Sequence, residues 1–172
     1  TYDGDNLYPV ARDFHFITGK PLSRLKDGNE VAFVFLLTLL GEGPAIIHQA
    51  REQLVVSYDL WEEKFKVTTL DPTRRSRPGL NASQAEAWCL DTLAVSAAGL
   101  TPDRPFWLRL ELRTAQPKEL SSVMGPGGVS LPAFIEIFSR RASPDDPYWT
   151  LQTGRLRLSD LVRTAGRGQR NG

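Results

Sequence analysis

The amino-acid sequence predicts an α+β fold, mainly antiparallel β-sheet or sandwich, with one long helix over residues 83–98 packed on it. Three observations predict this class. The run VAFVFLLTLL, residues 31–40, carries no charge and has the composition of a strand covered on both faces. Polar and apolar side chains alternate in several other segments, as they do in half-buried strands. A helix start signal of the form S-x-x-E stands at Ser83.

Length and composition indicate one domain. The chain has 172 residues, of which 41% are hydrophobic and 24% charged, values typical of a soluble globular protein. We assign residues 1–163 to a single globular domain and residues 164–172 to a disordered tail. The formal net charge of +1 creates no overall field, which disfavours nucleic acid as a partner. Whether a leader has been removed before Thr1 stays open.

The uncharged run at 31–40 is too short for a membrane helix, which needs roughly 17–25 apolar residues. It stops at Gly41, and Thr38 is its only polar side chain. We therefore expect no transmembrane segment in this chain. Because odd and even positions are both apolar, the run predicts a central strand of the sheet. It is also compatible with one wall of a pocket for an apolar ligand.

The elements around this strand follow from local patterns. Residues 13–19 alternate phenylalanine with polar neighbours and predict a short strand, and residues 21–26 predict one helical turn. Residues 53–60 and 64–70 alternate again and predict an antiparallel hairpin. The proline- and arginine-rich residues 71–82 predict a loop.

The predicted helix begins at Ser83, because Ser83 and Glu86 fit a capping box, and it ends before Gly99. The segment FWLRLELR, residues 106–113, predicts a strand by strict alternation. Its leucines Leu108, Leu110 and Leu112 face the core, and Trp107, Arg109, Glu111 and Arg113 face out.

The C-terminal third is less regular. Residues 114–128 hold two prolines and three glycines and predict a long loop. Residues 131–141 fit a helix or a strand, and the pattern does not separate the two. Residues 149–158 predict a last strand or hairpin.

Residue types that carry chemistry are few. His15 and His48 stand apart from any metal-ligand spacing, so we predict no metal site and no cofactor. Cys89, the only cysteine, falls on the core side of the helix and is interpreted as a small buried apolar residue. The glycines at 125–128 lack the GK[ST] ending of a phosphate-binding loop. No catalytic constellation is predicted.

Exposed aromatic and arginine side chains are the better candidates for a binding role. Trp107, Arg109 and Arg113 share the outer face of one strand, and Trp61 stands in a hairpin turn. Tryptophan and arginine are enriched at binding hot spots, so we predict that these residues contact a partner. The alternative is that a helix or second sheet covers that face.

Short strand and turn motifs are spread over residues 13–158. They are Leu25-x-Asp27-Gly28, Arg51-x-x-Leu54-x-x-Ser57-Tyr58-Asp59, Phe65-x-Val67, the Leu-Arg-Leu strand from Leu108, and Phe138-Ser139-Arg140 ahead of Trp149. In this order they resemble a family of bacterial envelope proteins, a domain of unknown function often encoded beside nitrogen-responsive two-component sensor kinases. The resemblance implies an antiparallel β fold outside the cytoplasm, in the periplasm or envelope, and no assigned activity. The loop at 114–130 and the insertion at 142–147 are longer than the family pattern.

These observations together predict a non-enzymatic extracytoplasmic accessory or binding module that contacts a protein partner or an apolar ligand. The alternative is an unrecognised enzyme whose site is assembled from acidic and histidine residues distant in sequence. A cleft with two convergent carboxylates, or a buried histidine–acid pair, would favour the enzyme. An apolar cavity or a flat aromatic patch would favour the binding module.

Overall fold

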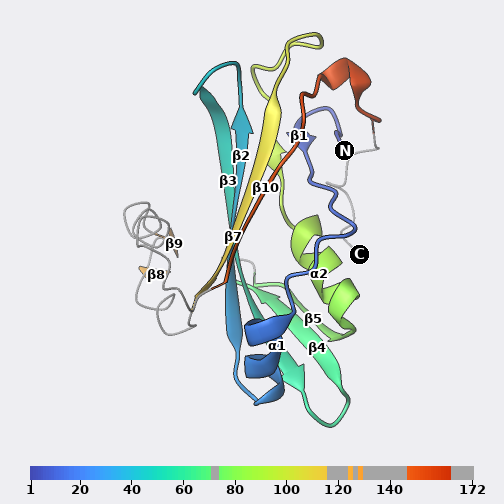
Figure 1. Cartoon of the computed structure of the whole chain (residues 1–172), viewed down its shortest axis with the longest axis vertical. Helices are drawn as coiled ribbons and strands as arrows, with labels where there is room; N and C mark the ends of the chain where they lie inside the picture. Colours follow the sequence, from blue (N-terminus) through green and yellow to red (C-terminus); the bar gives the residue numbers. More distant parts are fainter. Residues whose placement is uncertain (71–73, 116–123, 126–127, 130–146, 164–172) are drawn as a thin grey trace.

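The computed structural model describes residues 1–70, 74–115, 124–125, 128–129 and 147–163. Within these residues the chain is mostly antiparallel β-structure with two α-helices, which confirms the predicted α+β class (Figure 1). None of the helices in this described part is long and apolar enough to cross a membrane. The predicted helix or strand at 131–141 and the predicted tail at 164–172 lie outside the described residues.

Six strands form the main sheet in the order β10-β7-β2-β3-β4-β5, and every neighbouring pair is antiparallel. Their bounds are β2 Val31–Leu40, β3 Ile46–Asp59, β4 Lys64–Thr69, β5 Ser76–Leu80, β7 Trp107–Ala115 and β10 Tyr148–Gln152. The small strands are β1 Asn6–Leu7, β6 Val95–Ser96, β8 Met124–Gly125 and β9 Gly128–Val129, pairing as β1-β6 and β8-β9. The helices are α1 Gly19–Lys26, α2 Ala82–Asp91 and the 3-10 helix Leu158–Asp160.

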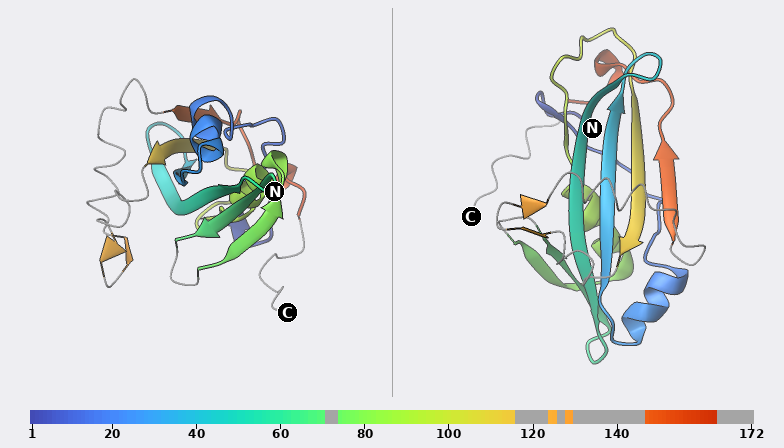
Figure 2. Two further views of the ribbon diagram at one scale, coloured as in Figure 1. Left: turned by 90° about the horizontal axis from the view of Figure 1, so that it is seen from below. Right: turned by 90° about the vertical axis from the view of Figure 1, so that its left-hand side faces the viewer.

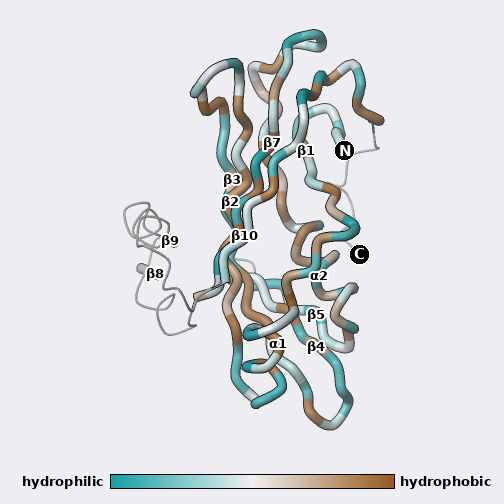
Figure 3. Tube along the Cα trace, in the orientation of Figure 1, coloured by the Kyte–Doolittle hydropathy of each residue, from teal (hydrophilic) through white to brown (hydrophobic). Residues whose placement is uncertain are grey.

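Strand β2 is the centre of the fold, as its uncharged sequence predicts. It pairs with β3 on one side and β7 on the other. Figure 3 colours each residue of this sheet by its hydropathy. Both helices lie on one side of the sheet (Figures 1 and 2). On that side the fully buried Phe33 and Phe35 meet Phe16 edge to face, with ring centroids 5.0 and 5.6 Å apart. On the other side Val34 and Leu36 centre a smaller apolar cluster.

The predicted hairpin and the predicted strand at 106–113 are both present. Strands β3 and β4 pair from Leu54↔Thr69 to Asp59↔Lys64, although β3 starts before the predicted residue 53. Burial alternates along the whole of β7, so its leucines face the helices. Residues 76–80, predicted as loop, form the edge strand β5, in which Pro78 and Gly79 fall at a shift in the register.

The helix is shorter than predicted and is capped by another residue. It runs from Ala82 to Asp91 and not over 83–98, because the chain then turns to pair Val95–Ser96 with β1. Its N-cap is Asn81, whose Oδ1 accepts the Gln84 N–H at 2.9 Å, while Gln84 Oε1 accepts the Asn81 N–H at 3.0 Å. The capping box is therefore N-x-x-Q, two residues before the predicted S-x-x-E.

The cap assignment gives a matched pair of substitutions. Asn81→Ala removes the acceptor for a first-turn amide and should lower the free energy of unfolding by about 0.5–2 kcal/mol. Ser83→Ala lies inside the helix and should change it by less than about 0.5 kcal/mol. Urea denaturation of both variants measures this difference. A larger loss for Ser83→Ala than for Asn81→Ala would contradict the assignment.

Residues 13–19, predicted as a strand, form no ladder. The backbone N–H groups of Phe16 and Ile17 donate instead to Oε1 of Glu86, at 2.7 and 2.8 Å. A side-chain carboxylate thus takes the place of a neighbouring strand, and it fixes Phe16 over the sheet.

Candidate functional site

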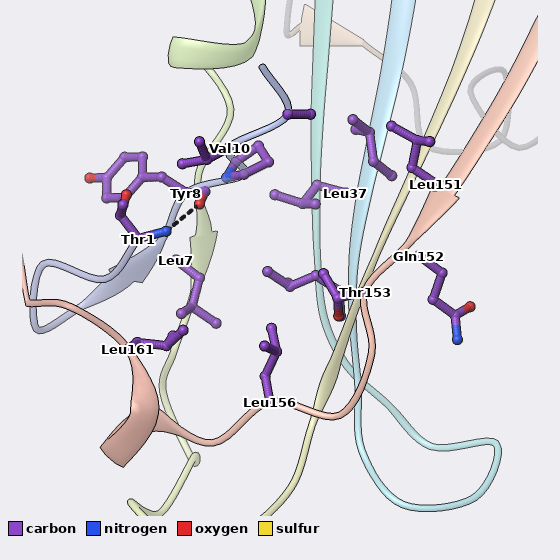
Figure 4. A pocket seen from close by; sticks show the side chains of 14 residues that line it. Thr1, Leu7, Tyr8, Val10, Leu37, Leu151, Gln152, Thr153, Leu156 and Leu161 are labelled. Atoms are coloured by element: carbon purple, nitrogen blue, oxygen red, sulfur yellow. Dashed lines mark hydrogen bonds between the residues drawn. The ribbon is translucent and has the colours of Figure 1, made fainter. Parts of the chain in front are cut away.

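An apolar cavity of about 260 Å³ lies beside the sheet, between β7 and β10 on one side and residues 7–11 on the other (Figure 4). Its described lining residues are Thr1, Leu7, Tyr8, Pro9, Val10, Ala11, Leu37, Leu108, Leu110, Leu151, Gln152, Thr153, Leu156 and Leu161. Figure 4 shows Leu37, Leu7, Leu156 and Leu161 around the space, contributed by segments far apart in the sequence. The cavity is therefore a product of the tertiary fold and not of one motif.

The floor of the cavity is set by strand register. Leu37 of β2 stands opposite Leu110 of β7, and both point to the side of the sheet that carries the helices. Leu108 is two positions along β7 and therefore faces the same way. The rim is more open, since Val10 is 58% and Leu151 39% exposed. An apolar ligand could thus enter from solvent and reach the leucine side chains of β2 and β7 that form the floor of the cavity.

The polar groups around the cavity already have partners. Tyr8 Oη donates to Asp3 at 2.6 Å, and Thr153 Oγ1 accepts the Leu108 N–H at 3.0 Å. Figure 4 shows the Gln152 amide directed away from the space. No Asp, Glu, His, Lys, Arg or Cys side chain occurs among the described lining residues. The cavity can bury apolar surface, and Tyr8, whose hydroxyl is bonded to Asp3, is the one titratable side chain among its described lining residues.

The residues predicted for binding lie elsewhere. Trp107, Arg109 and Arg113 share the face of β7 opposite to Leu108 and Leu110, and each is half-buried. The structure thus brings these three together but places them on the far side of the sheet from the cavity. Trp61 is separate: it is 98% exposed in the β3–β4 turn. That turn and Trp107 are at opposite ends of β2.

The polar face of β7 is internally paired. Tyr148 Oη donates to Glu111 at 2.6 Å, and the Arg113 guanidinium lies 4.7 Å from the centre of the Tyr148 ring. Arg109 Nε is 3.8 Å from Glu111. Burial and the hydrogen bond to Glu111 raise the pKa of Tyr148, which keeps the phenol protonated and donating. These contacts hold the β7–β10 pair together and do not by themselves identify a ligand.

A histidine–acid pair joins two distant segments. His15 Nδ1 is 2.8 Å from Glu86 Oε2, while Glu86 Oε1 accepts the two backbone amides described above. The hydrogen bond and the negative charge of Glu86 raise the pKa of His15. Glu86 is 4% exposed and its two oxygens hold three donors, so the pair clamps residues 15–17 to α2.

Cys89 and His48 have structural surroundings and do not form part of a reactive group. Burial raises the pKa of Cys89, so its sulfur is a neutral thiol and a weak nucleophile. His48 Nε2 lies 2.9 Å from the Ala98 carbonyl oxygen. Within the described part of the chain, no three His, Cys, Asp or Glu residues are grouped so that they could hold a metal ion.

Sequence reasoning missed the cavity as a site, although one signal pointed to it. Leu37 belongs to the uncharged run that was compatible with a pocket wall. The opposite wall comes from Leu7, Leu156 and Leu161, which no pattern connects to that run.

Comparison of the chain with protein families, curated proteins and solved structures finds no match. The resemblance to an envelope domain of unknown function therefore stays a prediction, and functional inference rests on the site itself.

Proposed function

We propose that this protein is a non-enzymatic binding module that takes an uncharged apolar ligand into the cavity between β7, β10 and residues 7–11. The observation that carries the proposal is the cavity itself, which has a leucine floor, an open rim and no charged side chain among its described lining residues. Burial of apolar ligand surface against such walls is favourable at roughly 25 cal/mol per Å².

Cavity size restricts the class of ligand. An engineered apolar cavity of about 150 Å³ suffices for benzene, and drug-sized ligands occupy pockets of about 300–1,000 Å³. At about 260 Å³ the cavity suits a short alkyl chain or a small ring system. A carboxylate or phosphate buried there would lose its hydration and meet no charged side chain among the described lining residues, so the ligand, or its buried part, is uncharged.

An extracytoplasmic location and a protein partner remain part of the proposal. The location rests on the family resemblance of the short motifs, and the partner on the aromatic and arginine side chains. Trp107, Arg109 and Arg113 share the outer face of β7, with Glu111 between the two arginines, and this face lies on the other side of the sheet from the cavity.

One observation favours the alternative function, an enzyme. His15 and Glu86 are a histidine–acid pair drawn from distant parts of the sequence. The binding module is the better proposal because Glu86 Oε1 is already occupied by two backbone amides and the pair does not line the cavity.

Binding of linear alcohols, from pentanol to decanol, tests the proposal. Affinity should rise by about 0.8 kcal/mol per methylene, roughly four-fold in dissociation constant, until the cavity is full. Calorimetric titration gives the affinities, and NMR shifts locate the site. Octanoate should bind more weakly than octanol, because the cavity presents no charged side chain to the carboxylate.

A matched pair of variants supplies the control. Ala11→Phe places a ring in the cavity and should abolish binding of the longer alcohols, whereas Ala98→Phe adds the same ring at an exposed position that does not line it. Equal binding by both folded variants, or no binding by the wild-type protein, would refute the cavity as the ligand site.

A further inference from the structure

The two outer edges of the main sheet differ in their sequences. β5 forms one edge and carries Pro78, Gly79, a shift in register and the exposed Arg77. Proline, irregular register and charge are features that keep an edge strand from pairing with another chain. β10 forms the other edge, pairs with β7 in a regular register and has the uncharged sequence YWTLQ. Figure 2 shows β10 as the outermost strand on its side of the sheet.

The pairing with β7 decides which backbone groups of β10 point outward. At one end of this ladder the Thr114 N–H donates to the Pro147 carbonyl oxygen at 3.4 Å. At the other end the Thr153 N–H donates to the Leu108 carbonyl oxygen at 2.9 Å. Every second residue of an antiparallel strand bonds to the same neighbour, so the odd-numbered residues from 147 to 153 face β7. The residues whose backbone groups face outward are Tyr148, Thr150 and Gln152.

These outward backbone groups have no partner within the described part of the chain. No backbone hydrogen bond from another described segment reaches Tyr148, Thr150 or Gln152, and all three residues are exposed. Pro147 does not weaken this edge, because the position of its missing N–H faces β7. Such a row of groups binds an extended chain, which supplies N–H and C=O groups at the same spacing.

A second copy of β10 matches this edge in one antiparallel register. With Thr150 opposite itself, Tyr148 stands opposite Gln152, so each outward-facing residue meets another and each pair exchanges two hydrogen bonds. On the side of the sheet that carries the helices, Leu151 then lies opposite Trp149. This contact covers Leu151, which is 39% exposed. Because no residue of the strand is charged, self-pairing brings no like charges opposite each other within it.

We propose that two copies of this protein pair through β10, antiparallel and centred on Thr150, and so join their six-stranded sheets into one continuous sheet. A second copy is favoured over an unrelated strand because the outward groups and the side chains of β10 match their own copies in the same register. Each copy uses the same surface, so the contact closes a two-fold dimer. The proposal does not require that the cavity binds a ligand.

Sedimentation of two variants at one position tests the pairing. The average mass of the wild-type protein should rise with concentration from 19.2 kDa toward twice that value and no further. Thr150→Pro removes the outward N–H at the centre of the contact, a change that an edge strand tolerates when this N–H faces solvent. The proline variant should stay at the monomer mass. Thr150→Val keeps the N–H and a strand-forming side chain, so it should dimerise like the wild-type protein.

Cysteine cross-linking tests the register and does not depend on the folding of the proline variant. The Cα atoms of a hydrogen-bonded antiparallel pair are about 5.5 Å apart, a separation that a disulfide spans. Mild oxidation with diamide should therefore convert Thr150→Cys into a covalent dimer. Ser76→Cys places the same thiol at an exposed position of the β5 edge and should remain monomeric. The native Cys89 is buried and takes no part.

Each measurement has a result that contradicts the proposal. A wild-type mass of 19.2 kDa at every concentration, dimerisation of Thr150→Pro like the wild-type protein, or a monomeric Thr150→Val would overturn pairing through β10. Equal cross-linking of Thr150→Cys and Ser76→Cys would overturn the register. Masses beyond the dimer would overturn the closed two-fold arrangement. Dimers of the wild-type protein and Thr150→Val, with selective cross-linking of Thr150→Cys, would support it.

Discussion

Replacing Phe35 with alanine should lower the free energy of unfolding by about 3–5 kcal/mol, the usual range for a buried phenylalanine. Its side chain is fully buried in the central strand, and its ring packs edge to face on Phe16 at 5.6 Å and 78°. The substitution leaves a cavity under the segment that Glu86 holds in place, where little can collapse to refill it. Chemical denaturation followed by tryptophan fluorescence gives the loss.

Val162→Ala is the control for this substitution. Its side chain is 76% exposed, so truncation should cost less than about 0.5 kcal/mol. A loss below about 1 kcal/mol for Phe35→Ala would mean that β2 is not the centre of the core.

Glu86→Ala should cost about 2–5 kcal/mol, because it leaves two buried backbone N–H groups without an acceptor. Those amides, of Phe16 and Ile17, have Oε1 of Glu86 as their partner. Loss of the carboxylate should also release Phe16 from the aromatic cluster. Glu86→Gln keeps one carbonyl oxygen for the amides and should lose less. Thermal and urea denaturation rank the two variants, and an equal loss for both would argue against the clamp.

The histidine side of this pair adds a pH dependence with a definite sign. Because Glu86 raises the pKa of His15 in the folded state, the ion pair stabilises fully below the unfolded pKa of about 6.5. That contribution is lost as pH rises through the folded-state pKa. The difference in unfolding free energy between wild type and His15→Asn should therefore shrink on going from pH 6 to pH 9. A difference that grows over this range would contradict the pairing.

The alternation of polar and apolar residues predicts best those strands whose burial follows one rule along their whole length. Strand β2 is apolar at nearly every position because both of its faces are covered, and β7 alternates because one face meets the core. Each needs only the period of its own side chains to be identified. The α+β class follows from these strands and from the helix that starts near residue 82.

The features that the local sequence pattern does not predict are those that depend on contacts with residues far away in the sequence. Residues 13–19 alternate like a strand, yet their amides bond to a carboxylate some 70 residues away. The sequence offers both S-x-x-E and N-x-x-Q as a capping box. The structure forms the second, and Glu86 of the first instead accepts the backbone amides of Phe16 and Ile17. The cavity has the same character, since Leu37 and Leu161 meet only once the sheet and the C-terminal segment are in place.

Because β2 lies between β3 and β7, one of its edges stays unpaired during part of protein synthesis. Its edge toward β3 is covered early, because that strand follows within a few residues. Its edge toward β7 stays unpaired until residues 107–115 have been made. Trp107, which pairs with Leu40 at the end of β2, comes nearly 70 residues later in the chain. At about 5–20 residues per second, a ten-residue uncharged strand stays open on one side for several seconds. Such an edge is a template for pairing with other chains, so the chain is most exposed to mispairing in the interval before β7 has been made and has paired with β2.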